Sequence, residues 1–516
     1  MWRSLAVCIG LSAILGSAAA HELNAEEVAG KRIYLHGQSD SGGEIHARVG
    51  AAGVVLPASA MPCAGCHGAD GRGRPEGGVA PPDIRWRSLI SAGGSRAGQT
   101  RRATGYDEAA LARAVTEGLG PDAQPLNPAM PRFVLSPRDM ARLTAYLKRL
   151  EEEHDPGLAP DRLRIGSLLP ASGPLAEYGD TVRMLLGRMV AKVNQGGGIH
   201  GRQLELVVLD PGPDQASAEL ALRQLLDEQE VFALLAPLVP ALEGHLAEML
   251  GPDGIPVIGS LAQFGEGDHG RSIFSPFPGL REQLLALAQF ASEQLPTHQR
   301  QGLVVFPQNA PLQRVAEQLA QRMEALGWTV MRHGYRPGQP DASWQSALGE
   351  AQAVFFLGSA EGFQAMSAAL PPSGNRPYLF ASAAQVSGVA LSVSPRHAER
   401  LFLAYPFVPE DRSEEGTALL ASQASGLNRH HGALQVSTYC AALLFFEGMK
   451  RSGRNASRQR LVTSLESLHD FPTGLTPALS FGPGARTGAP GAHVVGVNLQ
   501  QQRLLPLGRY IKPSSL

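Results

Sequence analysis

The sequence predicts a multidomain chain in which a small all-α domain precedes a two-lobed α/β domain. Three observations support this prediction. A Cys-x-x-Cys-His motif and a closing helical pattern lie within residues 26–150. A polar, proline-containing segment at 151–160 reads as a linker. From 161 to 516, short apolar runs alternate with helical patterns, which is typical of parallel α/β sheets, and this span is long for a single sheet.

The first twenty residues are typical of an export signal. Arg3 supplies a short positive region, residues 5–15 are apolar, and residues 18–20 (Ala-Ala-Ala) match a cleavage site. We therefore expect residues 1–20 to be a signal peptide. No later run approaches the roughly 20 apolar residues that a membrane-spanning helix needs.

The segment Cys63-Ala64-Gly65-Cys66-His67 indicates a covalent attachment site for c-type haem. Each thiol can form a thioether to a haem vinyl group, and the histidine that follows becomes the proximal iron ligand. A Cys-x-x-Cys pair can also be a disulfide, a thioredoxin-like redox pair or half of a zinc site. Zinc would need a second pair of ligands, and the chain has no second Cys pair. The histidine therefore favours one covalent haem c.

Cysteine usage agrees with this interpretation. The chain has 4 cysteines. Cys8 leaves with the signal, and two belong to the haem motif. Only Cys440 remains, so no disulfide within the chain is expected. It lies in the apolar helical run 439–446, where a buried, inert thiol is expected.

The predicted sixth iron ligand is Met130. It lies in the loop 128–133, where Pro131 stiffens the chain after it and can hold a thioether in place. A thioether ligand raises the redox potential relative to two imidazoles. The alternative is a hydrophobic loop methionine with no ligand role.

Other candidates for the sixth ligand are Met61, Met140, His36, His46 and His154. Met61 precedes Cys63 by two residues and so lies on the proximal side. Met140 falls on the apolar stripe of a helix whose predicted N-cap is Ser136, with Pro137 at its first position. Core packing is therefore the expected role of Met140.

Residues 30–150 resemble a monohaem cytochrome c domain of the type found beside periplasmic dehydrogenases. The matching features are residues 30–34 in the first helix, Cys63 to His67 followed by glycines at 68, 71 and 73, Met130-Pro131-x-Phe133, and Ala145-Tyr146-Leu147. The resemblance implies an all-α cytochrome c domain with His67 and Met130 as axial ligands. Together with the export signal, it implies a bacterial periplasm. An Arg- and Gly-rich stretch between Arg85 and Gly105 departs from the family and is expected to shape docking to an electron partner.

Strands and helices alternate after the linker. A helix is predicted over 175–194, and the glycines at 196–198 end it. The expected strands are 164–169, 204–209, 231–235, 256–258, 303–306, 353–357 and 378–380.

Residues 161–516 resemble the periplasmic ligand-binding proteins of the branched-chain amino acid type, which serve ABC transporters. The best segments are 165–179, 193–201 and Asp210 after the second strand. The resemblance implies a type I periplasmic-binding-protein fold whose two lobes close on a small molecule at the loops that follow the strands. In this family, the position of Tyr178 packs on the ligand. The ligand-binding residues expected are Ser172, Tyr178, Ser260, Ala262, Gln263, Ser359, Glu361 and Ser382.

The chain departs from amino-acid binders at the loop Pro237-Leu-Val-Pro240, where the family has Ser and Thr that hold a ligand carboxylate. Ala262-Gln263 stands where an Ala-Thr pair is expected, and Glu361 is the nearest candidate for the acid that meets an ammonium group. A less polar ligand is therefore expected, such as an alcohol, an aromatic compound or a carboxylic acid. An empty, structural pair of lobes is the alternative.

No motif of an ATPase, an α/β-hydrolase or a zinc protease is present, so no enzyme activity is expected. Charged residues make up 18% of the chain and its net charge is -2, without a run of like charge, which argues against a nucleic-acid partner. The expected function is a periplasmic electron carrier whose second domain docks or senses the substrate of a partner dehydrogenase. The alternatives are a transporter's substrate-binding component with a haem redox sensor, and a sensor in which lobe closure shifts the haem potential.

Overall fold

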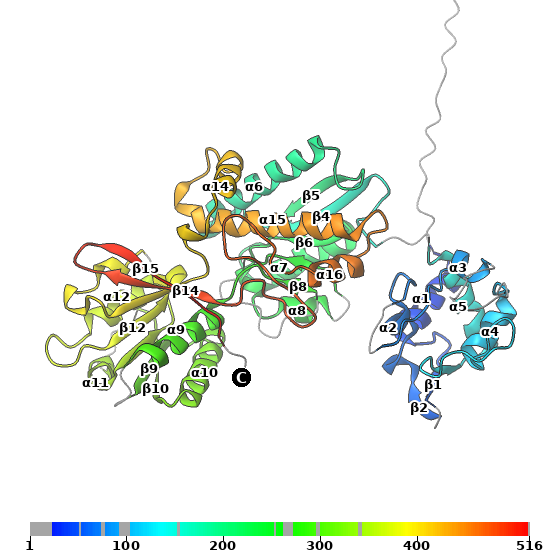
Figure 1. Ribbon diagram of the computed structural model, residues 1–516, viewed down its shortest axis with the longest axis horizontal. Helices are drawn as coiled ribbons and strands as arrows, with labels where there is room; N and C mark the ends of the chain where they lie inside the picture. Colours follow the sequence, from blue (N-terminus) through cyan, green and yellow to red (C-terminus); the bar gives the residue numbers. More distant parts are fainter. Residues whose placement is uncertain are drawn as a thin grey trace, which may run out of the picture. The chain divides into compact units, whose positions relative to one another are not determined.

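The computed structural model describes residues 23–50, 53–73, 78–91, 104–151, 155–251, 254–261, 272–295, 300–338, 343–386 and 388–513. The chain divides into two compact units, residues 1–154 and 155–516, which are described separately (Figure 1). The expected signal peptide, His154 and most of the Arg- and Gly-rich stretch lie outside the described residues. Within the described ranges, no helix is long and apolar enough to cross a membrane.

The first unit packs helices around an apolar core. Its helices are α1 (Ala25–His36), α2 (Cys63–His67), α3 (Trp86–Ile90), α4 (Glu108–Thr116) and α5 (Pro137–Arg149). It also contains a small antiparallel sheet, which the sequence did not predict, in the order β2-β1-β3. The strands are β1 (His46–Val49), β2 (Val54–Pro57) and β3 (Arg132–Val134). Strands this short carry too little alternation to be recognised in a sequence.

Strand β3 has a direct bearing on the predicted axial ligand. Phe133 pairs with Ala47 of β1, and both side chains are buried in the core. This pairing anchors the chain immediately after Met130 and Pro131. The loop that carries Met130 is therefore tied to the sheet at its C-terminal end.

Helix α5 begins as the sequence predicts. Ser136 is its N-cap and accepts a hydrogen bond from the backbone N–H of Asp139, and Pro137 lies in the first turn. Met140 packs against the core from its edge, while the rest of the predicted apolar stripe is buried, namely Leu143, Leu147 and Leu150. The core role predicted for Met140 is confirmed.

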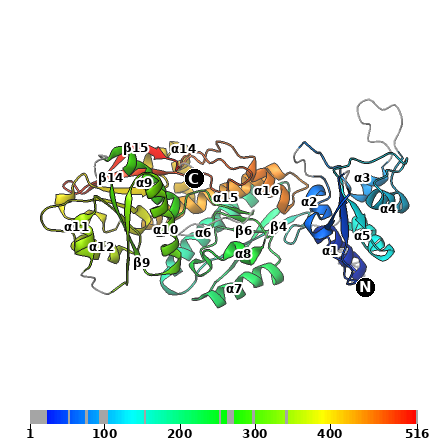
Figure 2. The same cartoon turned by 90° about the horizontal axis from the view of Figure 1, so that it is seen from below.

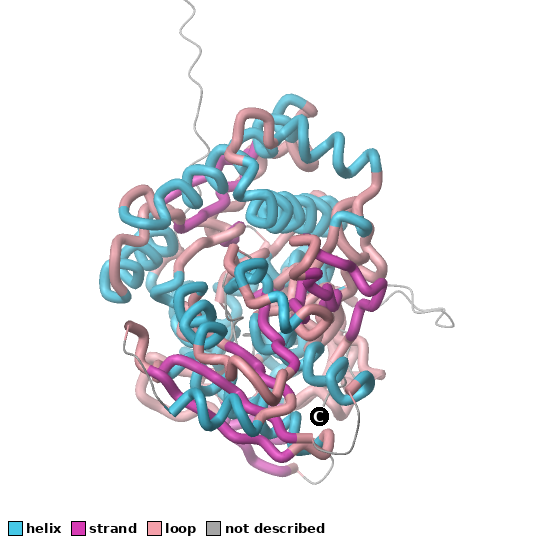
Figure 3. Tube along the Cα trace, turned by 90° about the vertical axis from the view of Figure 1, so that its left-hand side faces the viewer, coloured by secondary structure: helices cyan, strands magenta, loops and turns pink. Residues whose placement is uncertain are grey.

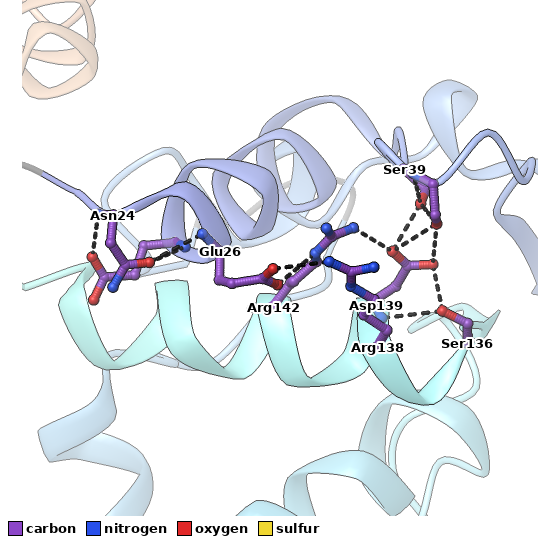
Figure 4. A network of polar contacts seen from close by, with 9 residues as sticks. Asn24, Glu26, Ser39, Ser136, Arg138, Asp139 and Arg142 are labelled. Carbon is purple, nitrogen blue, oxygen red and sulfur yellow. Dashed lines mark hydrogen bonds and ion pairs between the residues drawn. The ribbon is translucent and has the colours of Figure 1, made fainter.

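Helices α1 and α5 pack closely and share a polar network. A Cβ at Gly30 would lie 2.0 Å from the carbonyl oxygen of Arg142, so only glycine permits this approach. Arg142 donates to the carboxylate of Glu26 at 2.7 Å, and Asp139 accepts a hydrogen bond from Ser39 at 2.8 Å (Figure 4). The network joins both helices to the segment that follows α1.

The second unit has two lobes, each with helices on both faces of a sheet. The first lobe has a parallel sheet in the order β5-β4-β6-β7-β8. Its strands are β4 (Arg162–Leu168), β5 (Gln203–Leu209), β6 (Ala233–Leu235), β7 (Val257–Ile258) and β8 (Ile273–Phe274). Its helices are α6 (Ala176–Gln195), α7 (Gln215–Arg223), α8 (Leu246–Leu250), α14 (Glu414–Gln423), α15 (Gly432–Ser452) and α16 (Arg458–Glu466). The long helix α15 packs against α6, although the two are far apart in the sequence (Figure 2).

The second lobe has a sheet in the order β10-β9-β11-β12-β13-β14-β15, which is parallel through β13 and antiparallel after it. Its strands are β9 (Gln301–Pro307), β10 (Thr329–Tyr335), β11 (Ala353–Phe356), β12 (Tyr378–Ser382), β13 (Leu401–Tyr405), β14 (Ala492–Asn498) and β15 (Arg503–Ile511). Its helices are α9 (Leu280–Gln294), α10 (Ala310–Ala325), α11 (Ser343–Glu350), α12 (Ala360–Ala368) and α13 (Ala383–Val386). Figure 3 views the molecule from the side of this lobe, with its strands flanked by helices.

The predicted strands are all present, with ends within about two residues of those expected, and the predicted helix is α6. Cys440 lies in α15 and is 0% exposed, as predicted. Leu158, inside the expected linker, is buried in the core of the first lobe, so residues 155–160 pack with the second unit.

Candidate functional site

The Cys-x-x-Cys-His motif forms the short helix α2, which Pro62 precedes. Residues three apart on a helix lie on the same side, so Cys63 and Cys66 face one neighbourhood. Both are free thiols. Burial raises the pKa of the Cys63 thiol to about 12, whereas Cys66 is exposed. The pair is therefore positioned as two reduced thiols that can react with one planar group.

His67 is the buried member of the motif, at 8% exposure. Its Nδ1 lies 3.1 Å from the carbonyl oxygen of Pro82. A carbonyl can only accept, so Nδ1 carries the proton and donates it. Burial lowers the pKa of His67, although the bond to Pro82 opposes this shift. The imidazole is therefore neutral, and its Nε2 keeps a free lone pair for a metal, in an orientation that the Pro82 carbonyl sets.

An apolar pocket adjoins α2. Its lining residues are Ile33, Gly37, Ile45, Ala58, Cys63, Phe133, Leu135 and Leu143. Apart from the Cys63 thiol, these residues present only apolar atoms, which is the kind of wall against which a haem ring packs. Within the described ranges, no group of three or more His, Cys, Asp and Glu side chains could hold a metal ion. Two thiols, an imidazole with one free nitrogen and an apolar wall fit haem c.

Met130 is half-buried, and it is not among the residues that line this pocket. Its backbone N–H donates to the carbonyl of Asn127 at 3.0 Å, and Phe133, three residues further on, lines the pocket. The histidine candidates are placed differently: His36 is exposed at the end of α1, and Nε2 of His46 lies 3.5 Å from Glu44. The axial-ligand role of Met130 stays a prediction.

In the first lobe of the second unit, two expected ligand residues follow strand β4: Ser172 lies in the loop after it, and Tyr178 lies in the first turn of α6. Ser172 is exposed and donates to the carboxylate of Asp210 at 3.4 Å. Tyr178 is 42% exposed and stacks on His431, with ring centroids 4.4 Å apart and planes 24° apart. The stack leaves a large part of the Tyr178 side chain accessible, as an aromatic wall for a ligand requires.

His431 is held from two sides. Its Nδ1 lies 2.8 Å from the hydroxyl of Thr181, which itself donates to the carbonyl of Glu177. The hydroxyl therefore accepts the proton of Nδ1. On the other side, Nε2 lies 4.0 Å from the Glu177 carboxylate, which accepts a hydrogen bond from Asn428 at 2.6 Å. This arrangement fixes the ring on which Tyr178 stacks.

In the second lobe, the expected residues form local contacts. Ser359 is the N-cap of α12 and accepts from the N–H of Gly362 at 3.3 Å. Hydrogen bonds from its own backbone and from Ser359 lower the pKa of Glu361, so this exposed carboxylate is ionised. Ser382 is 1% exposed and donates to Gln283 at 2.7 Å. Its hydroxyl therefore bonds to another residue of the same lobe.

The apolar loop of the first lobe is as the sequence predicted. Leu238 is 9% exposed and its N–H donates to Leu168, and the carbonyl of Pro237 accepts from Leu261 at 2.9 Å. The second of these bonds ties the loop after β6 to the loop after β7. Ser260 is half-buried there, and Ala262 and Gln263 lie outside the described residues.

The sequence did not predict several residues that contact the expected site residues. Pro82 follows His67 by fifteen residues, and His431 and Thr181 are 250 residues apart, so spacing could not reveal either contact. Asp210 was recognised as a family position but not as the partner of Ser172. Among the described residues, Ser172, Tyr178, Ser359 and Ser382 each contact a partner in their own lobe.

Comparison with protein families agrees with this architecture. A family model described as periplasmic binding protein matches residues 162–500. The chain belongs to this family. A second model, cytochrome c, matches residues 58–151, so this periplasmic binding protein carries an N-terminal cytochrome c domain.

Among curated proteins, the chain is 30% identical over 77 residues to a leucine-, isoleucine-, valine-, threonine- and alanine-binding protein of Pseudomonas aeruginosa. The matched segment covers 15% of this chain and 21% of that protein. It is 24% identical over 204 residues to the chemotactic signal transduction system substrate-binding protein BasB of Halobacterium salinarum. This match covers 38% of this chain and 49% of BasB. The chain thus matches about a fifth and about half of these relatives' lengths.

Solved structures share the fold of the second unit. The leucine-binding protein LivK of Thermotoga maritima aligns with a TM-score of 0.54 and 17% identity, covering 68% of this chain and 99% of LivK. A fatty acid ABC transporter substrate-binding protein of Thermomonospora curvata aligns with a TM-score of 0.52 and 16% identity, covering 70% and 95%. These likenesses confirm the two-lobed type I fold.

Proposed function

We propose that this chain is a periplasmic c-type cytochrome that transfers single electrons, and that its second unit binds a small molecule connected with a partner dehydrogenase. The observation that carries the proposal is the site around α2. It combines two free thiols, a neutral buried imidazole oriented by Pro82 and an apolar pocket within a cytochrome c domain.

Each residue of the site has a defined part. Cys63 and Cys66 would each add their S–H across one vinyl double bond of a single haem, a reaction that needs no oxidant. His67 would bind the iron through Nε2, and Met130 through its thioether. When bound, haem supplies an iron that changes its oxidation state by one electron. The apolar residues around it keep water away and so help to set the potential.

The second unit would bind a ligand of low polarity. The loop after β6 offers the half-buried Val239 and the exposed Pro240, and Tyr178 offers an aromatic face. An alcohol, an aromatic compound or a carboxylic acid fits these groups, and it would be the substrate or product of the dehydrogenase that donates electrons. The unit would then bring the cytochrome to that enzyme or report on the supply of its substrate. In this proposal the chain is a carrier and a binder rather than an enzyme.

The test is mass spectrometry of the full-length protein, matured in cells that attach haem in the periplasm. Under denaturing conditions, one haem mass should remain bound, and it should be lost in a Cys63→Ser, Cys66→Ser double variant. Under native conditions, a further adduct that disappears on denaturation would give the mass of the ligand. A wild-type chain without covalent haem would overturn the first part of the proposal. No adduct after exposure to a panel of alcohols, aromatic compounds, acids and amino acids would overturn the second.

A second candidate is the substrate-binding component of an ABC transporter, with the haem as a redox sensor. Family membership and the titles of related proteins, which name transporters and a chemotactic system, favour it. Electron transfer to added redox proteins separates the two candidates. A carrier exchanges electrons rapidly with periplasmic dehydrogenases whether or not the ligand is present, whereas a sensor shows a midpoint potential that shifts on ligand binding.

A further inference from the structure

The loop that carries Met130 is built as a closed structure. The N–H of Leu126 donates to the carbonyl of Gly118 at 2.8 Å, and the N–H of Gly120 donates to Gln124, also at 2.8 Å. Beyond this closure, the side-chain oxygen of Asn127 accepts from the N–H of Ala129 at 2.9 Å. These hydrogen bonds hold the loop closed. Met130 is the last residue of the loop and directly precedes Pro131.

One side chain spans the two ends of the segment from 126 to 130. Arg132 lies in β3, and its guanidinium donates through Nη1 to the carbonyl of Met130 and through Nη2 to the carbonyl of Leu126, the latter at 3.4 Å. Because a guanidinium is a rigid fork, the two bonds hold the carbonyls at a set separation. The backbone of Arg132 is itself anchored through its pairing with Arg48 of β1.

Gly118 makes room for this contact. A Cβ at that position would lie 1.7 Å from Nε of Arg132 and 2.1 Å from Cζ, so the guanidinium packs directly against the glycine. The backbone of Gly118 also has φ of 74°, a conformation that side-chain-bearing residues rarely adopt. The loop is thus shaped around the Arg132 side chain.

We propose that Arg132 is the positioning residue for the axial ligand: it clamps the carbonyls of Leu126 and Met130 and so keeps the Met130 thioether bound to iron. The inference rests on the proposed role of Met130. Without the clamp, the thioether would leave the iron more often, and an external ligand would compete for its place more effectively.

The experiment uses the full-length, haem-loaded ferric protein and titrates it with imidazole, which competes with a thioether for the open side of the iron. Arg132→Lys keeps the positive charge but cannot bond two carbonyls as a fork. We expect it to bind imidazole about tenfold more tightly than the wild type, which corresponds to about 1.4 kcal/mol. It should also weaken the red absorption band of a thioether on ferric iron and lower the midpoint potential. The matched control is Arg138→Lys, since Arg138 is an exposed arginine of the same unit that pairs with Glu26.

Gly118→Ala provides a second variant, because it displaces the guanidinium while leaving Arg132 in place, and it should reproduce the effect of Arg132→Lys. Met130→Ala distinguishes loss of the Arg132 clamp from loss of the axial ligand itself. If Met130→Ala abolishes the red band while Arg132→Lys and Gly118→Ala match the wild type, the clamp is refuted and the axial ligand stands. If Met130→Ala leaves the band and the imidazole affinity unchanged, the axial assignment fails and the clamp fails with it.

Discussion

Replacing Tyr34 by phenylalanine removes one buried hydrogen bond behind the haem-attachment helix. Tyr34 is 0% exposed, and its hydroxyl donates to the carbonyl of Gly68 at 2.6 Å. Since Gly68 directly follows His67, this bond joins α1 to the end of α2. Phenylalanine keeps the ring that packs 5.6 Å from Tyr146, but the Gly68 carbonyl then has only the N–H of Gly71, at 3.2 Å, as its donor. Because one bond is lost and the carbonyl stays partnered, we expect the first unit to lose about 0.5–1.5 kcal/mol of unfolding free energy at pH 7.

The same substitution removes a dependence on pH. Burial, with smaller contributions from nearby negative groups, raises the pKa of Tyr34 well above its ordinary value of 10.0. Above pH 10 the hydroxyl loses its proton in the unfolded chain and keeps it in the folded one, so the folded state binds more protons. The free energy of unfolding therefore falls as the pH rises, by up to about 1.4 kcal/mol per pH unit. In Tyr34→Phe this contribution is absent.

The assay is denaturant unfolding of the full-length haem protein at pH 7, 10 and 11. Soret absorbance follows the first unit, and far-UV circular dichroism follows the whole chain. Tyr510→Phe is the matched control, because the Tyr510 hydroxyl accepts from the N–H of Gly491 at 3.0 Å in the second unit, and its loss should leave the Soret transition unmoved. If Tyr34→Phe shows the wild-type midpoint at pH 7 and the wild-type decline above pH 10, the bond has no energetic role and the reasoning is refuted.

Three further predictions concern other parts of the chain. Burial, together with nearby arginines, lowers the pKa of His397 to about 4, and the ring is 0% exposed. The second unit should therefore lose up to about 3 kcal/mol as the pH falls from 6.5 toward 4, a loss that His397→Phe should remove in acid unfolding monitored by circular dichroism. Gly30→Ala should destabilise the first unit by about 3 kcal/mol in the Soret-monitored assay, because its Cβ meets the Arg142 backbone, and an unchanged midpoint would contradict the close approach. His431→Ala should weaken binding of the ligand found by native mass spectrometry about fivefold in calorimetry, since Tyr178 loses the ring on which it stacks, and equal affinity would show that the stack does not shape the site.

The helices and strands that could be predicted are those whose signals lie close together in the sequence. Helix α5 was predicted from its N-cap and apolar stripe, because these signals lie within a few residues of one another. Seven strands of the parallel sheets were predicted from continuous apolar runs. Strand β10, which is partly exposed along most of its length, and the two-residue strand β8 carry no such run and were missed. Strands β13, β14 and β15 were missed as well, although β13 (Leu401–Tyr405) is a continuous apolar run.

The sequence by itself determined the haem motif, the order of the two units, and the family of each, because these depend on residues that are close in the chain. Only the tertiary structure decided which groups meet. His67 needed the Pro82 carbonyl, Tyr178 needed His431, and the loop of Met130 needed Arg132. The physical reason is that hydrogen bonds and ring contacts act over a few ångströms in space, and the chain brings such partners together only when its helices and sheets pack.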